Sequence, residues 1–121
     1  MKVEIRELFS TDTGSTALDE YSPGDPANVG ILVRSVLGVS EEPGEDSFDV
    51  MVCTPNWLAD HLHHHPERHI FGRHHLIVQR WDYVELRKII TGLIERLDGQ
   101  DWHEFGTRLD GYMHWEFGTP W

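Results

Sequence analysis

The sequence is poor in cysteine and in basic residues, and each shortage limits what the chain can be. Cys53 is the single cysteine among 121 residues, so no disulfide can form within the chain. Ten Lys and Arg residues stand against 21 Asp and Glu, which gives a formal net charge of −11. Nucleic-acid binding needs clustered basic side chains for the phosphates, so this charge balance predicts no nucleic-acid partner.

Long apolar runs and phosphate-binding loops are also missing. No apolar stretch approaches the ~20 residues that a membrane span needs, so we expect no membrane association. The first residues, 1–4, lack the basic and then apolar pattern of a signal peptide, which together with the unpaired cysteine predicts a cytoplasmic protein. Neither GxGxxG nor GxxxxGK[ST] occurs, and we expect no cofactor.

Hydrophobic periodicity predicts one α+β domain over residues 1–121. The hydrophobic content of 39% is enough for a chain of this length to form its own core. Strands are expected at 2–9, 29–39, 48–53, 74–81 and 112–117, and helices at about 55–65, 83–97 and 102–110. Because strands and helices do not alternate regularly, we expect an antiparallel or mixed sheet of about five strands, with about three helices packed on one face.

Residues 48–58 form the corner around which these elements are arranged. Phe48, Val50 and Val52 alternate with more polar residues, as a strand requires, and Thr54-Pro55 is a typical helix start. The longest helix, expected at 83–97, should begin with an Asp82–Glu85 capping box and stop at Asp98-Gly99. Four aromatic residues are expected in the core: Trp57, Trp102, Trp115 and Phe117.

The negative charge is concentrated in the first half of the chain. Residues 1–60 hold 12 acidic and three basic residues, and the segments 10–28 and 41–49 contain nine acids without any Lys or Arg. A solvated surface that keeps the protein soluble would explain this pattern. The alternative is a docking surface for a protein partner that is itself basic.

Three groups of residues could carry chemistry. Cys53 lies beside a helix start, which can activate a thiol for a small hydrolase, but no Cys-His pair follows from the spacing, and a free cysteine is often only a small buried side chain. The histidine cluster from His61 to His75 offers metal ligands at i and i+4, and a metal-binding module is the alternative function. Three acids, Glu104, Asp110 and Glu116, have structural explanations in helix caps and strand alternation. We therefore expect no catalytic, cofactor or metal site and no enzyme.

The corner at 48–58 resembles that of the immunity protein 8 family of bacterial polymorphic toxin systems. Further similar segments are 72–78, 81–83, 102–109 and 115–117. The resemblance implies an α+β protein that binds and neutralises a cognate toxin domain, often a nuclease, inside the producing cell. It implies no catalytic residues. The histidine-rich segment 63–69 departs from the pattern expected for the family.

The resemblance and the charge pattern lead to one hypothesis for the partner surface. A toxin that cuts nucleic acid must be basic where it meets phosphate, so an acidic inhibitor can occupy that surface and accelerate association. An aromatic side chain among the acids would add affinity. The residues expected to face the toxin are Asp12, Asp19, Glu20, Tyr21, Asp25, Glu41, Glu42, Glu45 and Asp46.

Overall fold

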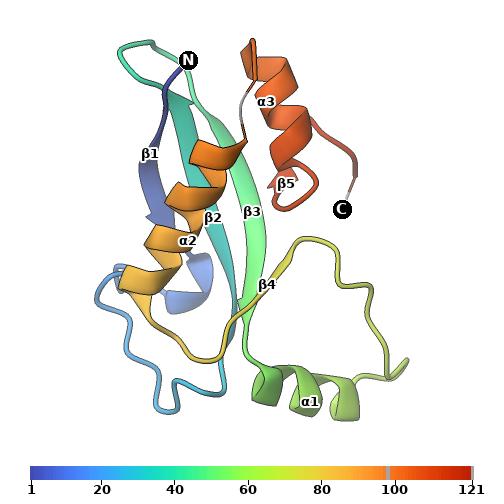
Figure 1. Cartoon of the computed structure of the whole chain (residues 1–121). Helices are drawn as coiled ribbons and strands as arrows, with labels where there is room; N and C mark the ends of the chain where they lie inside the picture. The colour runs from blue at the N-terminus through green and yellow to red at the C-terminus, as the bar shows by residue number, and fades with distance from the viewer. Residues whose placement is uncertain (98, 121) are drawn as a thin grey trace.

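A five-stranded mixed sheet forms the centre of the molecule, which a computed structural model describes over residues 1–97 and 99–120. The strands are β1 (Val3–Phe9), β2 (Gly30–Val39), β3 (Asp46–Cys53), β4 (His75–Ile77) and β5 (His114–Trp115). They are ordered β1-β2-β3-β4, and β5 also pairs with β3 (Figure 1). The predicted α+β fold is confirmed.

The sheet combines antiparallel and parallel pairing around β3. β1 and β2, and β2 and β3, run antiparallel, and the hairpin expected on either side of the acidic turn is present. β4 runs parallel to the second half of β3, whereas β5 pairs antiparallel with the first half of β3, at Phe48 and Asp49. β4 and β5 are therefore successive, short additions along β3.

Two helices, α2 (Tyr83–Arg96) and α3 (Trp102–Leu109), cover one face of this sheet (Figure 1). Alternate residues of β2 and β3 point towards them and are buried, as the period of two predicted. The helices contribute the other half of the core through a stripe at helical spacing, consisting of Leu86, Ile90, Leu93, Ile94, Phe105 and Leu109.

The helix starts form as their capping residues predict. Asp82 Oδ1 accepts the backbone N–H of Glu85 at 3.2 Å, and Asp101 Oδ1 accepts that of Glu104 at 2.8 Å. α2 ends at Arg96; of the expected stop at Asp98-Gly99, Asp98 lies outside the described residues.

The last two strands are shorter than the sequence pattern predicted. Strand 74–81 shrinks to β4 because Val78 donates the final bond to Cys53 and the Trp81 N–H then donates to the Pro26 carbonyl, 2.7 Å away, on another segment. Strand 112–117 shrinks to two residues because the Asp110 carboxylate accepts the Trp115 N–H and turns the chain. Phe117 was expected in the core but is 69% exposed.

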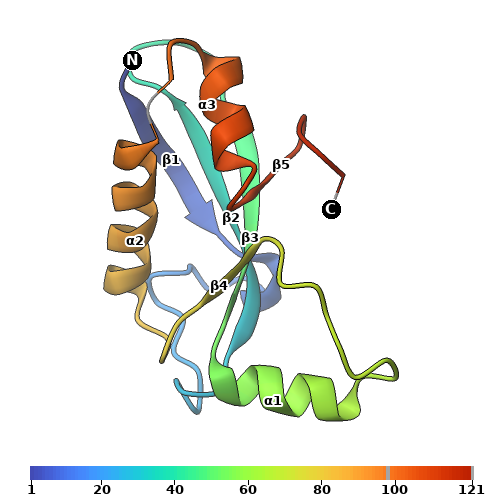
Figure 2. The same cartoon turned by 45° about the vertical axis from the view of Figure 1, so that its right-hand side comes forward.

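Helix α1 (Pro55–His64) projects from the end of the sheet instead of lying over it (Figures 1 and 2). Thr54, itself fully buried, accepts the Val29 N–H and caps the helix start. Beyond that junction α1 has no buried residue. Its closest packing is at Trp57, whose indole occupies the space above Gly30 that a side chain would fill. We call α1 and the following segment to residue 73 the arm.

Candidate functional site

The two acid-rich segments lie at opposite ends of β2. The segment 10–28 leads into the start of this strand, and the turn 40–45 follows its end (Figure 1). A ten-residue strand is about 30 Å long, since each residue adds about 3.3 Å. The nine residues expected to face the toxin therefore form two separate surfaces, and the structure does not bring them together in one.

At the turn end, several acids are held by the protein itself. Asp46 Oδ2 accepts the indole N–H of Trp102 at 2.6 Å and that of Trp115 at 3.2 Å. Glu45 is 3.7 Å from the Arg6 guanidinium, which also donates to backbone carbonyls of the turn. These contacts fix the shape of the turn and leave Asp46 with a structural role.

At the loop end, the long segment is folded against its neighbours. Asp12 Oδ2 accepts the Leu32 N–H at 2.8 Å, and Asp25 Oδ1 accepts the Ala27 N–H at 3.0 Å. The Tyr21 ring meets the Trp81 indole edge-on, with ring centres 5.3 Å apart. The loop is thus attached to the connection between β4 and α2.

Four of the predicted acids have carboxylates with no hydrogen bond or ion pair to the described part of the chain. They are Asp19, Glu20, Glu41 and Glu42, and all four are exposed. Two lie at each end of β2, so each end presents a pair of uncompensated charges.

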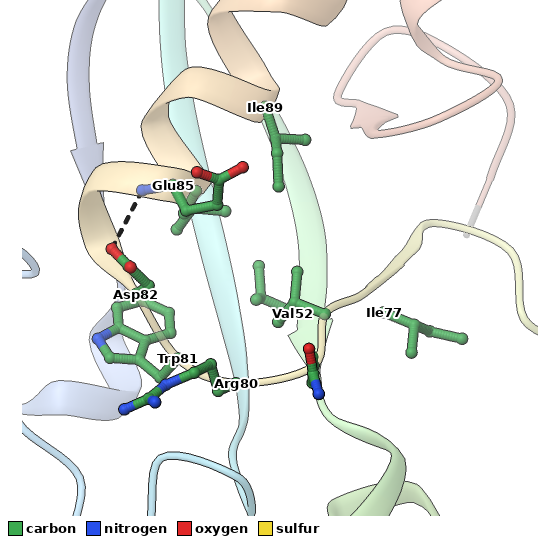
Figure 3. A pocket seen from close by; sticks show the side chains of 10 residues that line it. Val52, Ile77, Arg80, Trp81, Asp82, Glu85 and Ile89 are labelled. Carbon is green, nitrogen blue, oxygen red and sulfur yellow. Dashed lines mark hydrogen bonds between the residues drawn. The ribbon is translucent and has the colours of Figure 1, made fainter.

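A cavity of about 320 Å³ opens beside the attached loop, between β4 and the start of α2 (Figure 3). Val52 lies in its middle, Ile77 on one side, and Asp82 and Glu85 on the other. A second cavity of about 180 Å³ lies further along α2 and shares the side chain of Ile89 with the first. Together we call them the β4–α2 groove.

The groove exists because two helices are too few to cover the whole sheet. α2 lies over β1 and β2 and α3 lies near β5, which leaves the second half of β3 and the short β4 without a helix above them (Figure 1). Two large apolar residues that border these cavities remain exposed: Tyr112 is 53% accessible, and Ile77 is 58% accessible because its side chain points away from α2 (Figure 3). Such exposure is typical of a contact surface.

The candidate nucleophile and the candidate metal ligands do not form reactive sites in the described residues. Cys53 is fully buried, and burial raises the pKa of its thiol, which disfavours the reactive thiolate. His61 stacks on Trp57 on the arm, with ring centres 4.6 Å apart, and lies tilted against His65, whose ring centre is 5.3 Å away. Nowhere in residues 1–97 or 99–120 do three His, Cys, Asp or Glu side chains gather as a metal ligand set.

The three acids all have structural roles, but only Asp110, at the end of α3, lies in the setting that the sequence predicted: Glu104 bonds the residue before its expected N-cap partner Asp101, and Glu116 lies beyond the end of β5. Glu104 accepts the Gln100 N–H, and Glu116 accepts the Ser47 N–H. Asp110 is buried, which opposes ionisation, but N–H groups of Trp115 and Thr119 outweigh this and lower the pKa of its carboxyl. On the sheet face without α2 and α3, Asp49 bonds Arg34 in a bidentate pair that raises the pKa of the guanidinium.

Sequence reasoning missed the groove residues Ile77, Glu85 and Ile89. One signal was available, because segment 74–81 is apolar on both faces. If such a strand lies at the edge of a sheet that helices cover on one side only, the apolar side chains of its other face stay exposed. Glu85 was assigned only to its capping box. The gap between the helices could not be inferred, because it depends on where α2 lies across the sheet.

The fold and its surfaces define a small α+β protein with acidic ends, an apolar groove and no assembled catalytic set among the described residues. No helix in that part of the chain combines the length and apolarity needed to cross a membrane. The family model for Immunity protein 8 matches residues 3–119, and the chain belongs to this family. No curated protein and no solved structure matches it. Membership makes it an immunity protein and implies a cognate toxin as its partner.

Proposed function

We propose that this protein neutralises a toxin of a polymorphic toxin system by covering a basic surface that the toxin uses to bind nucleic acid. The family supports the toxin partner, and the net charge of −11 supports a basic surface on it. The proposal places the encounter in the cytoplasm of the producing cell. It requires no cofactor and no catalytic residue of this chain.

The observation that carries the proposal is the set of uncompensated acids. Asp19 and Glu20 precede Tyr21, an aromatic side chain held against Trp81, and no basic residue neutralises them. Fixed charges beside a rigid aromatic ring attract a basic partner at long range and offer it an anchor at contact. The loop end of β2 is therefore the proposed first contact, and the turn end adds to the overall field.

A matched pair of variants tests the proposal. Asp19→Asn/Glu20→Gln and Glu41→Gln/Glu42→Gln each remove two charges, but from ends of β2 that lie about 30 Å apart, so only the first pair lies at the proposed first contact. We expect the first variant to slow association with the cognate toxin domain by about three- to tenfold at low salt. The second should have a smaller effect, and both should flatten the salt dependence.

Two outcomes would contradict the proposal. Wild-type protein that neither binds that toxin nor protects cells expressing it would rule out the immunity function proposed for the pair. Association rates that stay unchanged in both variants across ionic strengths would rule out the electrostatic mechanism.

A further inference from the structure

We infer that the β4–α2 groove receives a segment of the toxin that carries apolar side chains and at least one Lys or Arg. This inference rests on the proposed function, since the occupant is the toxin partner. It adds the place of contact and the chemistry of the segment, which the acidic loops alone do not specify.

The shape and lining of the groove support an inserted segment. Its two adjoining cavities, about 320 and 180 Å³, are large enough for successive side chains of one segment. The floor consists of the apolar residues Val50, Val52, Leu76, Leu86 and Ile89. Burial of the partly exposed Ile89, which both cavities share, and of the exposed Tyr112 by a partner would remove apolar surface from water at the centre of the contact.

Charge complementarity determines which end of the groove takes the basic side chain. Asp82 and Glu85 border the first cavity opposite Ile77, and Arg80 nearby forms no ion pair with either acid (Figure 3). Trp81, in the same wall, holds the loop that bears Asp19 and Glu20. At the other end, the Arg73 guanidinium lies 3.4 Å from the Asp110 carboxylate. A Lys or Arg stem would lie over Val52 with its charge towards Glu85.

Substitutions on the two flanks of α2 test the inference with matched controls. Ile89→Asp and Glu85→Lys change the groove, whereas Val84→Asp and Glu95→Lys make the same kinds of change at exposed positions of α2 outside it. We expect each groove variant to weaken binding of the purified toxin domain about thirtyfold or more, mainly through faster dissociation. The controls should stay within about threefold, and thermal unfolding verifies that all four variants fold.

Cysteine footprinting tests the same contact with milder changes. The native Cys53 is fully buried, so the thiol to be followed is the one that Ile89→Cys or Val84→Cys adds. The toxin should protect the thiol at position 89 from a maleimide at least tenfold and leave the labelling rate at position 84 unchanged. Toxin binding without protection at position 89, or with wild-type affinity in Ile89→Asp and Glu85→Lys, would overturn the groove as the contact and leave the immunity function intact. Absence of any binding by the wild-type chain would overturn both.

Discussion

Replacing Asp46 by Ala should destabilise the fold, although Asp46 was first expected at the toxin surface. Its carboxylate accepts two indole N–H groups, from Trp102 at 2.6 Å and from Trp115 at 3.2 Å, and so joins the end of the β2–β3 turn to α3 and β5. The alanine variant leaves both indoles without this acceptor. The variant therefore separates a structural role of the acid from a role in binding.

The size of the effect follows from the two hydrogen bonds. A hydrogen bond to a charged group contributes about 1.5–3 kcal/mol, and the lower value applies here because Asp46 is only half-buried and one oxygen serves both donors. We expect a loss of about 3 kcal/mol, equivalent to a fall in melting temperature of about 10 °C for a chain of this length. Asp46→Asn keeps an acceptor oxygen and should lose about half as much.

Thermal unfolding followed by tryptophan fluorescence measures this loss directly. Glu45→Gln is the control: it removes the neighbouring charge, whose 3.7 Å pair with Arg6 is exposed and should contribute less than about 0.5 kcal/mol. The two variants should differ in melting temperature by about 10 °C, and a difference of less than about 2 °C would refute the structural role of Asp46.

Further predictions concern the C-terminal turn, the arm and the buried thiol. The pKa of Asp110 is lower in the folded protein than in the unfolded chain. The ionised carboxylate therefore stabilises the fold fully above the unfolded pKa of about 3.9, and this stabilisation is lost as the pH falls through the folded pKa. The difference in unfolding midpoint between wild type and Asp110→Asn should shrink below about pH 4. Gly30→Ala would place a methyl group 2.1 Å from the Trp57 ring, so we expect a loss of about 1–3 kcal/mol in denaturant unfolding and a shifted Trp57 emission. Native Cys53 should react with a maleimide only at the rate of unfolding, and fast labelling of the folded protein would contradict its burial.

The parts of the fold set by local rules could be predicted from the sequence. The β2–β3 hairpin follows from alternation on both sides of a Pro-Gly turn, and the starts of α2 and α3 follow from Asp82 and Asp101, whose carboxylates accept first-turn N–H groups. These signals lie within a few residues of the structure that they determine.

The parts set by contacts distant in sequence could not. β4 ends early because Trp81 bonds Pro26, and β5 is short because Asp110 captures the Trp115 N–H. The separation of the acidic segments, in contrast, was already implied by the strand predicted at 29–39 between them, because β2 holds its two flanking segments at opposite ends of the sheet. The groove depended on the path of α2, for which no local pattern exists.

The arm has a consequence for how such a protein can change over generations. Since α1 has no buried residue, most substitutions along it should alter the free energy of unfolding by less than about 0.5 kcal/mol. Selection on foldability is therefore weak there, and the histidine-rich stretch is free to diverge between relatives while the sheet and its two covering helices stay fixed. A lineage can thus vary the outline of its surface without endangering the core that every member needs.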